Sequence, residues 1–339
     1  MTQGFPPDRS SPLPVVFCFA GQGSQYYGMA ADLMAEDAVF RHWMRLGDAI
    51  VAQRHGFSVL AEIYGEERRP FTPFDRMEAS HPAIFLVQYA LAKVLQHHGL
   101  RPDGLLGVSL GELVAQSVAG MTSFEASLCA VADQPALFRR TCPAGGMVAV
   151  LGPPDLYTRR PVLAARSEVA GVNARGHFVL SALADDLPAI EADLKACEVP
   201  FQRLPVPFAF HSRFVEAAKD AWRDLFGQQR REMAFWPVWS SCTGNVIGPA
   251  TPDLSWRIVR QRMNVQQTLL TLEQQGGAIY VDLSPSGTLA ALFRQELDDK
   301  SPSRLLSVLS PFGGDIERLR KTIVALGDRM ARCPGPILV

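Results

Sequence analysis

A serine between two glycines is the feature of this chain with the clearest chemical potential. The stretch Gly107–Glu112 reads G-V-S-L-G-E and lies between an apolar run, residues 104–106, and a segment of helical pattern, residues 113–119. A G-x-S-x-G sequence between a strand and a helix is typical of a nucleophile elbow, in which the glycines allow a sharp turn. The turn would place Ser109 at a helix N-terminus, where main-chain N–H groups and the helix dipole stabilise an oxyanion. A plain strand-to-helix turn is the alternative that this hexapeptide leaves open.

A serine hydroxyl needs a general base at neutral pH, and the chain offers seven histidines. His211 is the strongest candidate because it lies in an aromatic loop, residues 207–214, after a proline-flanked strand end. An imidazole in apolar surroundings stays neutral near pH 7, as a base must, although a structural histidine is the alternative. Most of the others occupy helical, surface-like positions or helix ends, while His81 precedes Pro82 at a helix start and His177 opens a strand.

Length and composition limit the class of protein. The 339 residues, 47% hydrophobic and 20% charged, suffice for one large domain and a smaller one with a sizeable core. A net charge of −1 gives no reason to expect a nucleic acid or membrane partner, and no apolar run reaches the roughly 20 residues of a membrane span. The six cysteines lack C-x-x-C spacing and resemble reduced thiols of a cytoplasmic protein, so neither a metal site nor a cofactor is expected.

The predicted elements indicate an α/β protein. A buried parallel strand over residues 15–19 ends in a glycine loop, and a second strand over residues 105–108 leads into the elbow. Short strands and helices alternate from residue 146 to 206, which favours a small ferredoxin-like α+β insert. Helices are predicted over 29–56, 82–99, 124–138, 187–197 and 288–297, with later strands over 238–241 and 278–283.

These elements predict an α/β-hydrolase-like parallel-sheet core that is interrupted by the small subdomain and then completed. The polar, proline-rich start has no signal-peptide pattern and is interpreted as a leader. The predicted division is a flexible leader over 1–14, a large domain formed by 15–145 and 207–330, a small subdomain over 146–206, and a tail over 331–339.

Four motifs, in this order, resemble those of the malonyl-CoA:acyl-carrier-protein acyltransferases, and the resemblance covers roughly residues 15–330. They are Gly21-Gln22-Gly23-Ser24-Gln25, the elbow around Ser109, Asn173 and Phe210-His211-Ser212. The resemblance implies the fold described above and ping-pong acyl transfer, in which Ser109 attacks a thioester and His211 takes its proton. It also implies an oxyanion hole made by Gln22 and the N–H of Leu110. A backbone carbonyl usually orients the histidine in this family, and one near Leu283–Ser284 is the candidate here.

The departures from that family concern the acyl pocket. Val108 replaces the histidine usual in the elbow, and Gln134 falls where malonyl-specific members carry an arginine that binds the malonyl carboxylate. Arg139 and Arg140 lie five and six residues further on and point elsewhere on a helix of period 3.6. Because a glutamine offers no charge, a buried malonyl carboxylate would lack its partner, at a typical cost of about 3–5 kcal/mol.

We therefore expect a neutral acyl group such as acetyl. Phe208, often histidine in malonyl enzymes, makes the predicted pocket more apolar. The predicted substrate-binding residues are Gln134, Val108, Phe208, Phe210, Asn173 and His81.

The replacement of arginine by glutamine resembles a subgroup of the family, the stand-alone acyl hydrolases of trans-acyltransferase polyketide synthases. The runs 22–29 and 177–181 are similar to that subgroup as well. The resemblance implies that water attacks the acyl-Ser109 ester, with His211 as base. The predicted function is release of acetyl or another neutral acyl group from the phosphopantetheine thioester of an acyl carrier protein, as proofreading in polyketide biosynthesis.

Two other functions stay open. The first is an acyltransferase that takes malonyl or another acyl unit from acyl-CoA to the carrier. The second is a non-catalytic module that binds carrier proteins, against which the intact Ser109, His211 and Gln22 argue. An ordinary esterase would lack the Gly21-Gln22-Gly23 loop and would usually place a histidine near the C-terminus, where this chain has none after His211.

Overall fold

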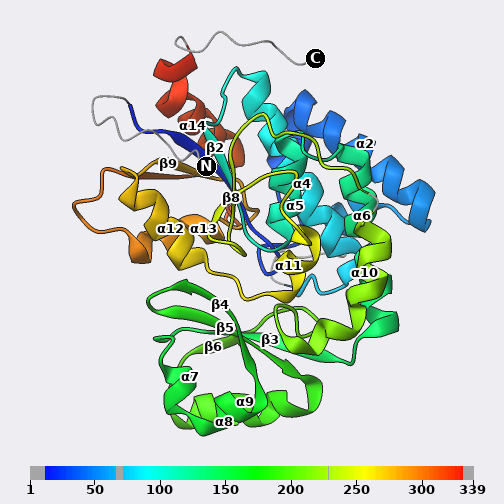
Figure 1. The fold of residues 1–339 in the computed structure, drawn as a ribbon. Coiled ribbons are helices and arrows are strands. Elements are labelled where there is room, and N and C mark those ends of the chain that lie inside the picture. The colour runs from blue at the N-terminus through cyan, green and yellow to red at the C-terminus, as the bar shows by residue number, and fades with distance from the viewer. Residues whose placement is uncertain (1–11, 66–71, 228, 331–339) are drawn as a thin grey trace.

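The computed structural model describes residues 12–65, 72–227 and 229–330, which form two sheets with helices packed around them (Figure 1). The larger sheet has the strand order β10-β9-β1-β2-β7-β8, and all neighbours in it are parallel except β7 and β8. Its strands are β1 (Val15–Phe19), β2 (Gly104–Gly107), β7 (Val238–Ser240), β8 (Asn245–Ile247), β9 (Ile279–Asp282) and β10 (Arg304–Ser307).

The continuous apolar run of β1 is buried at every residue because β1 lies between β2 and β9 and helices cover both faces of the sheet. Figure 1 shows α2, α4 and α6 on one side of this sheet and α12 and α13 on the other. The helices around it are α1 (Ala31–Glu36), α2 (Ala38–His55), α3 (Val59–Tyr64), α4 (Met77–His97), α5 (Leu110–Val118), α6 (Phe124–Thr141), α10 (Lys219–Phe226), α11 (Leu254–Arg260), α12 (Val265–Gln274), α13 (Thr288–Glu296) and α14 (Asp315–Met330).

The smaller sheet is antiparallel, with the order β4-β5-β3-β6. Along the chain its elements run β-α-β-β-α-β, and that order of strands confirms the predicted ferredoxin-like insert. A separate apolar core that includes Val148, Phe178 and Ile190 lies between this sheet and its helices. The elements are β3 (Gly145–Val150), α7 (Leu156–Arg159), α8 (Pro161–Arg166), β4 (Glu168–Ala174), β5 (His177–Leu183), α9 (Leu187–Ala196) and β6 (Phe201–Arg203).

Several elements differ from the prediction. The single helix predicted over 29–56 is two helices, because Asp37 is extended between them and its carboxylate accepts a hydrogen bond of 2.7 Å from the N–H of Phe40, which begins α2. Helices α3, α10, α12 and α14 and strands β8 and β10 were not predicted.

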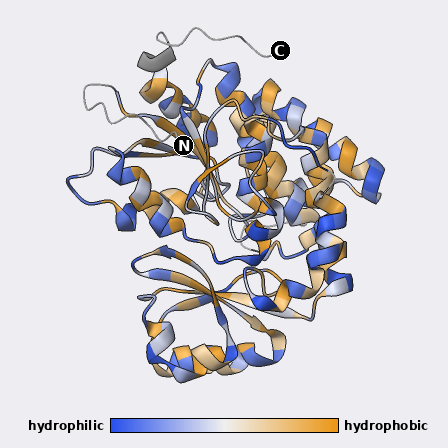
Figure 2. Cartoon of the chain, viewed as in Figure 1, coloured by the Kyte–Doolittle hydropathy of each residue, from blue (hydrophilic) through white to orange (hydrophobic). Residues whose placement is uncertain are grey.

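Hydrophobic residues predominate in the strands and on the inward helix faces, while hydrophilic residues lie on the outer faces (Figure 2). Among the described helices none is long and apolar enough to cross a membrane. Residues 1–11 of the predicted leader and the predicted tail over 331–339 lie outside the described residues.

Candidate active site

Ser109 lies in the tight turn between β2 and α5 and has φ 54° and ψ −124°, a conformation that is strained for a residue with a side chain. The two flanking glycines are required by close backbone contacts. A Cβ on Gly107 would lie 2.4 Å from the Cα of Glu112, and one on Gly111 would lie 2.1 Å from the carbonyl oxygen of Phe19. The turn is therefore a nucleophile elbow in geometry as well as in sequence.

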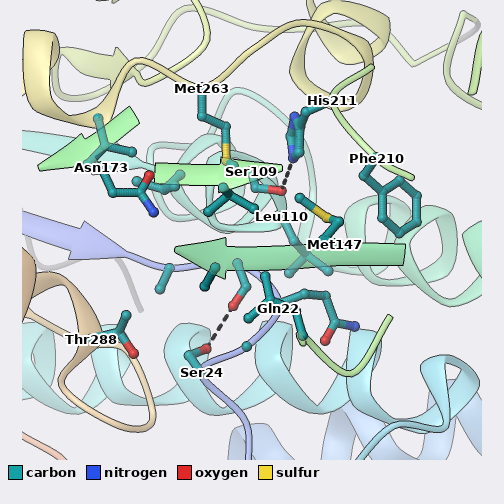
Figure 3. A pocket seen from close by; sticks show the side chains of 18 of the residues that line it. Gln22, Ser24, Ser109, Leu110, Met147, Asn173, Phe210, His211, Met263 and Thr288 are labelled. Carbon is teal, nitrogen blue, oxygen red and sulfur yellow. Dashed lines mark hydrogen bonds between the residues drawn. The ribbon is translucent and has the colours of Figure 1, made fainter. Parts of the chain in front are cut away.

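His211 faces this serine, and its Nε2 lies 2.9 Å from Ser109 Oγ (Figure 3). The other ring nitrogen, Nδ1, lies 3.0 Å from the carbonyl oxygen of Gln261. A carbonyl oxygen can only accept, so Nδ1 carries the hydrogen and Nε2 is free to accept the serine proton. His211 also has a positive φ of 58°, and its main-chain N–H donates to the carbonyl of Val259 at 2.9 Å.

The predicted orienting carbonyl near Leu283–Ser284 is wrong. The carbonyl of Ser284 accepts a hydrogen bond of 3.3 Å from the N–H of Gly287 within its own segment. Gln261 follows the last residue of α11, and carbonyls in the last turn of a helix have no partner within that helix. The carbonyl that orients His211 therefore comes from the C-terminal end of α11.

Burial lowers the pKa of His211 to about 4, against the opposing effect of its hydrogen bond to Gln261. His211 as a whole is 4% exposed. Desolvation penalises the charged imidazolium, so His211 is neutral at pH 7 and can take a proton from Ser109.

The glycine loop after β1 packs directly against the elbow. A Cβ on Gly21 would lie 2.9 Å from the Cβ of Ser109 and 3.3 Å from the main-chain nitrogen of Leu110. In the described part of the chain, the main-chain N–H groups of Gln22 and Leu110 have no hydrogen-bond acceptor. The loop is itself fixed, since Ser24 Oγ donates to the carbonyl of Gly21 at 2.8 Å (Figure 3). Gln22 Nε2 also donates to Ser80 Oγ at 3.0 Å.

A cavity of about 300 Å³ opens beside the Ser109–His211 pair. The structure brings together in its wall nine of the predicted site residues, namely Ser109, His211, Gln22, Leu110, Gln134, Val108, Phe210, Asn173 and His81. Met147 and Met263 lie close to the pair as well, and they come from the small sheet and from the segment before α12 (Figure 3).

Phe208 does not line this cavity, contrary to the prediction. Its ring packs against Phe138 and Phe210, with centroids 5.9 and 6.0 Å apart, and belongs to the core. The chain around it is irregular, so the two-residue spacing from Phe210 does not bring both rings to one surface.

The cavity wall carries no charge at neutral pH. None of the described residues that line it is Asp, Glu, Lys or Arg. Its three histidines, His81, His177 and His211, all have pKa values lowered by burial. The nearest arginines in sequence to Gln134 lie elsewhere: Arg139 is an exposed ion-pair partner of Glu78, and Arg140 is exposed.

Gln134 and His81 adjoin each other in this wall. Gln134 lies on α6 and His81 on α4, and both are buried. Burial lowers the pKa of His81 to about 3. The Gln134 side chain and the Val131 backbone lie near the ring and oppose that shift, although neither makes a hydrogen bond of normal geometry with a ring nitrogen. His81 is therefore a neutral hydrogen-bonding group at any pH at which the protein would work.

Glu112 lies on α5, the helix that follows the nucleophile elbow, and forms hydrogen bonds with the loop after β7. Its carboxylate accepts hydrogen bonds of 3.0 Å from Ser241 Oγ and from the main-chain N–H of Cys242. Burial raises its pKa to about 7, although these hydrogen bonds oppose the shift. The Cys242 thiol in turn donates to Gln261 Oε1 at 3.5 Å, so the segment that orients His211 is linked to the helix that begins at the nucleophile.

Sequence reasoning missed Gln261, Glu112 as an anchor, and the cavity residues Met147, His177, Trp222, Met263 and Thr288. The last five come from five separate segments. His177 opens the run 177–181, which resembles the hydrolase subgroup but carried no indication of a place in the cavity, and the other four belong to no recognised motif. Among the described residues no group of three histidine, cysteine or acidic side chains could hold a metal ion.

Comparison with known proteins decides the family. Residues 16–325 match the model of the acyl transferase domain. The chain belongs to the acyl transferase family. It is 40% identical over 322 residues to the polyketide biosynthesis acyltransferase homolog BaeD of Bacillus velezensis, covering 95% of this chain and 98% of that protein. It is 38% identical to the homolog PksD of Bacillus subtilis, covering 90% and 94% of the two chains.

Solved acyltransferase structures have the same fold as this chain. A loading acyltransferase from the avermectin modular polyketide synthase superposes with a TM-score of 0.81 at 26% identity, covering 92% of this chain and 99% of that one. The malonyl-CoA:acyl carrier protein transacylase of Helicobacter pylori superposes with a TM-score of 0.78 at 22% identity, covering 94% and 99%. The second likeness shows the fold alone.

Proposed function

We propose that this acyl transferase-family protein hydrolyses neutral acyl thioesters carried on the phosphopantetheine of an acyl carrier protein, and that it clears such acyl groups during polyketide biosynthesis. The observation that carries the proposal is the uncharged cavity beside the Ser109–His211 pair. Two relatives of similar length are polyketide biosynthesis acyltransferase homologs, which supports the setting. The five described cysteines are free thiols, in keeping with a cytoplasmic location.

The first half-reaction forms an acyl-serine ester. Ser109 Oγ attacks the thioester carbon as its proton passes to His211 Nε2, and the N–H groups of Gln22 and Leu110 stabilise the oxyanion. The carbon–sulfur bond then breaks, and His211 returns the proton to the leaving sulfur. The carrier departs with a free thiol, and the acyl group stays on Ser109.

The second half-reaction uses water. His211 takes a proton from the attacking water, whose oxygen forms a bond to the acyl carbon. The ester bond breaks, Ser109 Oγ recovers a proton from His211, and the free carboxylic acid leaves. A malonyl group would bring a carboxylate into a wall that offers no cation, so we expect it to be a poor substrate.

Acyl transfer is the second candidate function, and the family membership favours it. In that case a thiol, from a carrier or from CoA, would attack the acyl-Ser109 ester in place of water. Acyl-CoA would then be an alternative donor to the acylated carrier. The two functions share every step up to the ester.

The test is to load a carrier protein with acetyl or with malonyl and to follow the carrier by intact mass spectrometry after adding the protein. We expect the acetyl carrier to return to its free-thiol mass much faster than the malonyl carrier. Movement of malonyl from CoA through Ser109 to an unloaded carrier would instead support the transferase. If neither acyl group moves and Ser109→Ala binds the carrier as well as the unaltered protein, the chain is a binding module.

A further inference from the structure

One part of the cavity wall holds buried polar side chains that lack hydrogen-bond partners. Gln134, His81 and Trp222 are 4, 3 and 1% exposed. Gln134 Nε2, both ring nitrogens of His81 and Trp222 Nε1 have no partner among the described residues. Buried polar groups are rarely left unpaired, because their lost hydration is then not replaced. We call these three residues the polar wall.

Aromatic contacts hold the polar wall together on the cavity surface. Phe138 lies one helical turn after Gln134, and its ring centroid is 5.5 Å from Trp222 and 4.8 Å from Phe210. The ring of Phe210 lies in turn 6.4 Å from His81. Each member of the polar wall lines the same cavity as Ser109, so an acyl chain held on Ser109 shares that space with them.

The chemical groups of the polar wall determine which functional group on an acyl chain they can bind. It offers an amide, a neutral imidazole and an indole N–H, which together supply donors and acceptors without charge. Such groups suit a hydroxyl or a ketone oxygen. A carboxylate would find no cation here, and an unsubstituted alkyl chain would leave every one of these groups unpaired.

Much of the remaining wall is apolar and suits a hydrocarbon chain. Aliphatic and thioether side chains from several elements line it, among them Leu113, Met147, Val179, Ile258, Met263 and Leu292. A chain with an oxygen at one position would therefore find hydrogen bonds at the polar wall and apolar contacts elsewhere.

We infer that the preferred acyl group carries a hydroxyl or ketone oxygen on its chain, which the polar wall binds. This inference rests on the proposed function for its substrate, since it concerns the acyl group that Ser109 accepts. It narrows the neutral acyl groups to oxygenated ones.

The test compares carriers loaded with butyryl, 3-hydroxybutyryl, 3-oxobutyryl and 4-hydroxybutyryl groups. We expect the kcat/KM for at least one oxygenated group to exceed that for butyryl by about 10-fold or more, because butyryl leaves buried groups unpaired. Gln134→Met keeps the length of the side chain but removes its hydrogen bonds, and should lower the ratio by about 3-fold or more. Trp222→Phe removes the indole N–H while keeping a ring, and should lower the ratio by about 3-fold if this N–H contributes one neutral hydrogen bond.

Trp43→Phe is the matched control, since Trp43 lies on α2, is half-buried against Tyr89 of α4 and does not line the cavity. It should leave the ratio unchanged. The mass of acyl-Ser109 after brief mixing gives a second readout of the same preference, and it does not depend on whether water or a thiol is the later acceptor.

Equal rates for butyryl and all three oxygenated groups, in the unaltered protein, would overturn the inference while leaving hydrolysis intact. A preference that survives both Gln134→Met and Trp222→Phe would overturn the assignment to the polar wall. If no carrier is deacylated but acyl-Ser109 still forms preferentially from an oxygenated group, the proposed hydrolysis fails and the inference stands.

Discussion

The reacting pair and the polar wall face the same cavity but differ in how their polar atoms are satisfied. Ser109 Oγ and both ring nitrogens of His211 have partners at 2.9 and 3.0 Å. At the polar wall, Gln134 Nε2 and both ring nitrogens of His81 have none among the described residues. The hydrogen bonds that position the reacting atoms are therefore made within the protein. The hydrogen bonds that would select the substrate need a partner atom on the acyl group.

The two buried histidines sharpen this comparison. Burial lowers both pKa values, to about 4 for His211 and to about 3 for His81. Only His211 has a carbonyl that fixes its Nδ1 hydrogen and leaves Nε2 directed at a hydroxyl. Neutrality is therefore common to both, and the orienting carbonyl of Gln261 is what makes one of them suited to act as a base.

Removal of the nucleophile should produce the largest effect. Ser109→Ala should lower deacylation of the acetyl carrier by at least about 10³-fold, because no acyl-serine ester can form. Intact mass spectrometry should also show no acylated protein. Ser117→Ala is a matched control, as this buried serine lies on the same helix but does not line the cavity, and it should retain activity. Acylated Ser109→Ala protein would contradict the assignment.

A positive charge placed in the polar wall should shift the substrate preference from acetyl toward malonyl. Gln134→Arg supplies a cation that can hold a carboxylate, and should raise the malonyl-to-acetyl ratio of kcat/KM by about 100-fold. Arg140→Gln, on the exposed end of the same helix, should leave that ratio unchanged. An unaltered ratio in Gln134→Arg, with a folded protein, would show that Gln134 does not face the acyl group.

The pH dependence of kcat/KM should report the protonation of His211 in the reacting pair. His211 acts as a base only when neutral, so kcat/KM should be flat from about pH 6 down to about pH 5 and fall about tenfold per unit below its pKa of about 4. Circular dichroism at each pH would show that the fold persists. A fall that begins near pH 6.5, the ordinary value for histidine, would mean that the base is solvated.

The smallest effect should come from the anchor of the elbow helix. Glu112→Ala leaves Ser241 Oγ and the Cys242 N–H without their shared acceptor, and should lower the free energy of unfolding by about 2 kcal/mol or more. Glu112→Gln keeps one acceptor oxygen and should lower it by less. Urea denaturation measures both, and equal values for the two variants would show that these hydrogen bonds do not stabilise the elbow.

The sequence predicted the parts of the site whose geometry needs particular residue types. The elbow around Ser109 and the loop at Gln22 depend on glycines, and these leave a readable pattern. The carbonyl of Gln261 could not be predicted because every residue carries one, and only the end of α11 makes this one available. Phe208 was misassigned because an apolar type alone does not distinguish a cavity wall from the core behind it.

In the fold, too, only the elements with a distinctive residue pattern could be predicted from the sequence. Strand β1 and the ferredoxin-like insert were predicted from buried apolar runs and from the alternation of short elements. Strand β10 lies at the edge of the sheet and is only half-buried, so its residues, Arg304–Ser307, have no continuous buried pattern. Trp222 belongs to the short helix α10, and its place in the cavity follows from packing against α6 rather than from its neighbours in sequence.

The most direct test of the proposed hydrolysis is the fate of the acyl-Ser109 ester. The acetylated protein would be formed by brief mixing with acetyl carrier, then transferred to water enriched in ¹⁸O, with and without an excess of unloaded carrier bearing its free thiol. We predict acetate that contains one ¹⁸O atom, at a rate that the unloaded carrier does not increase. Transfer of acetyl from Ser109 to the carrier, with little labelled acetate, would contradict the account and establish an acyltransferase.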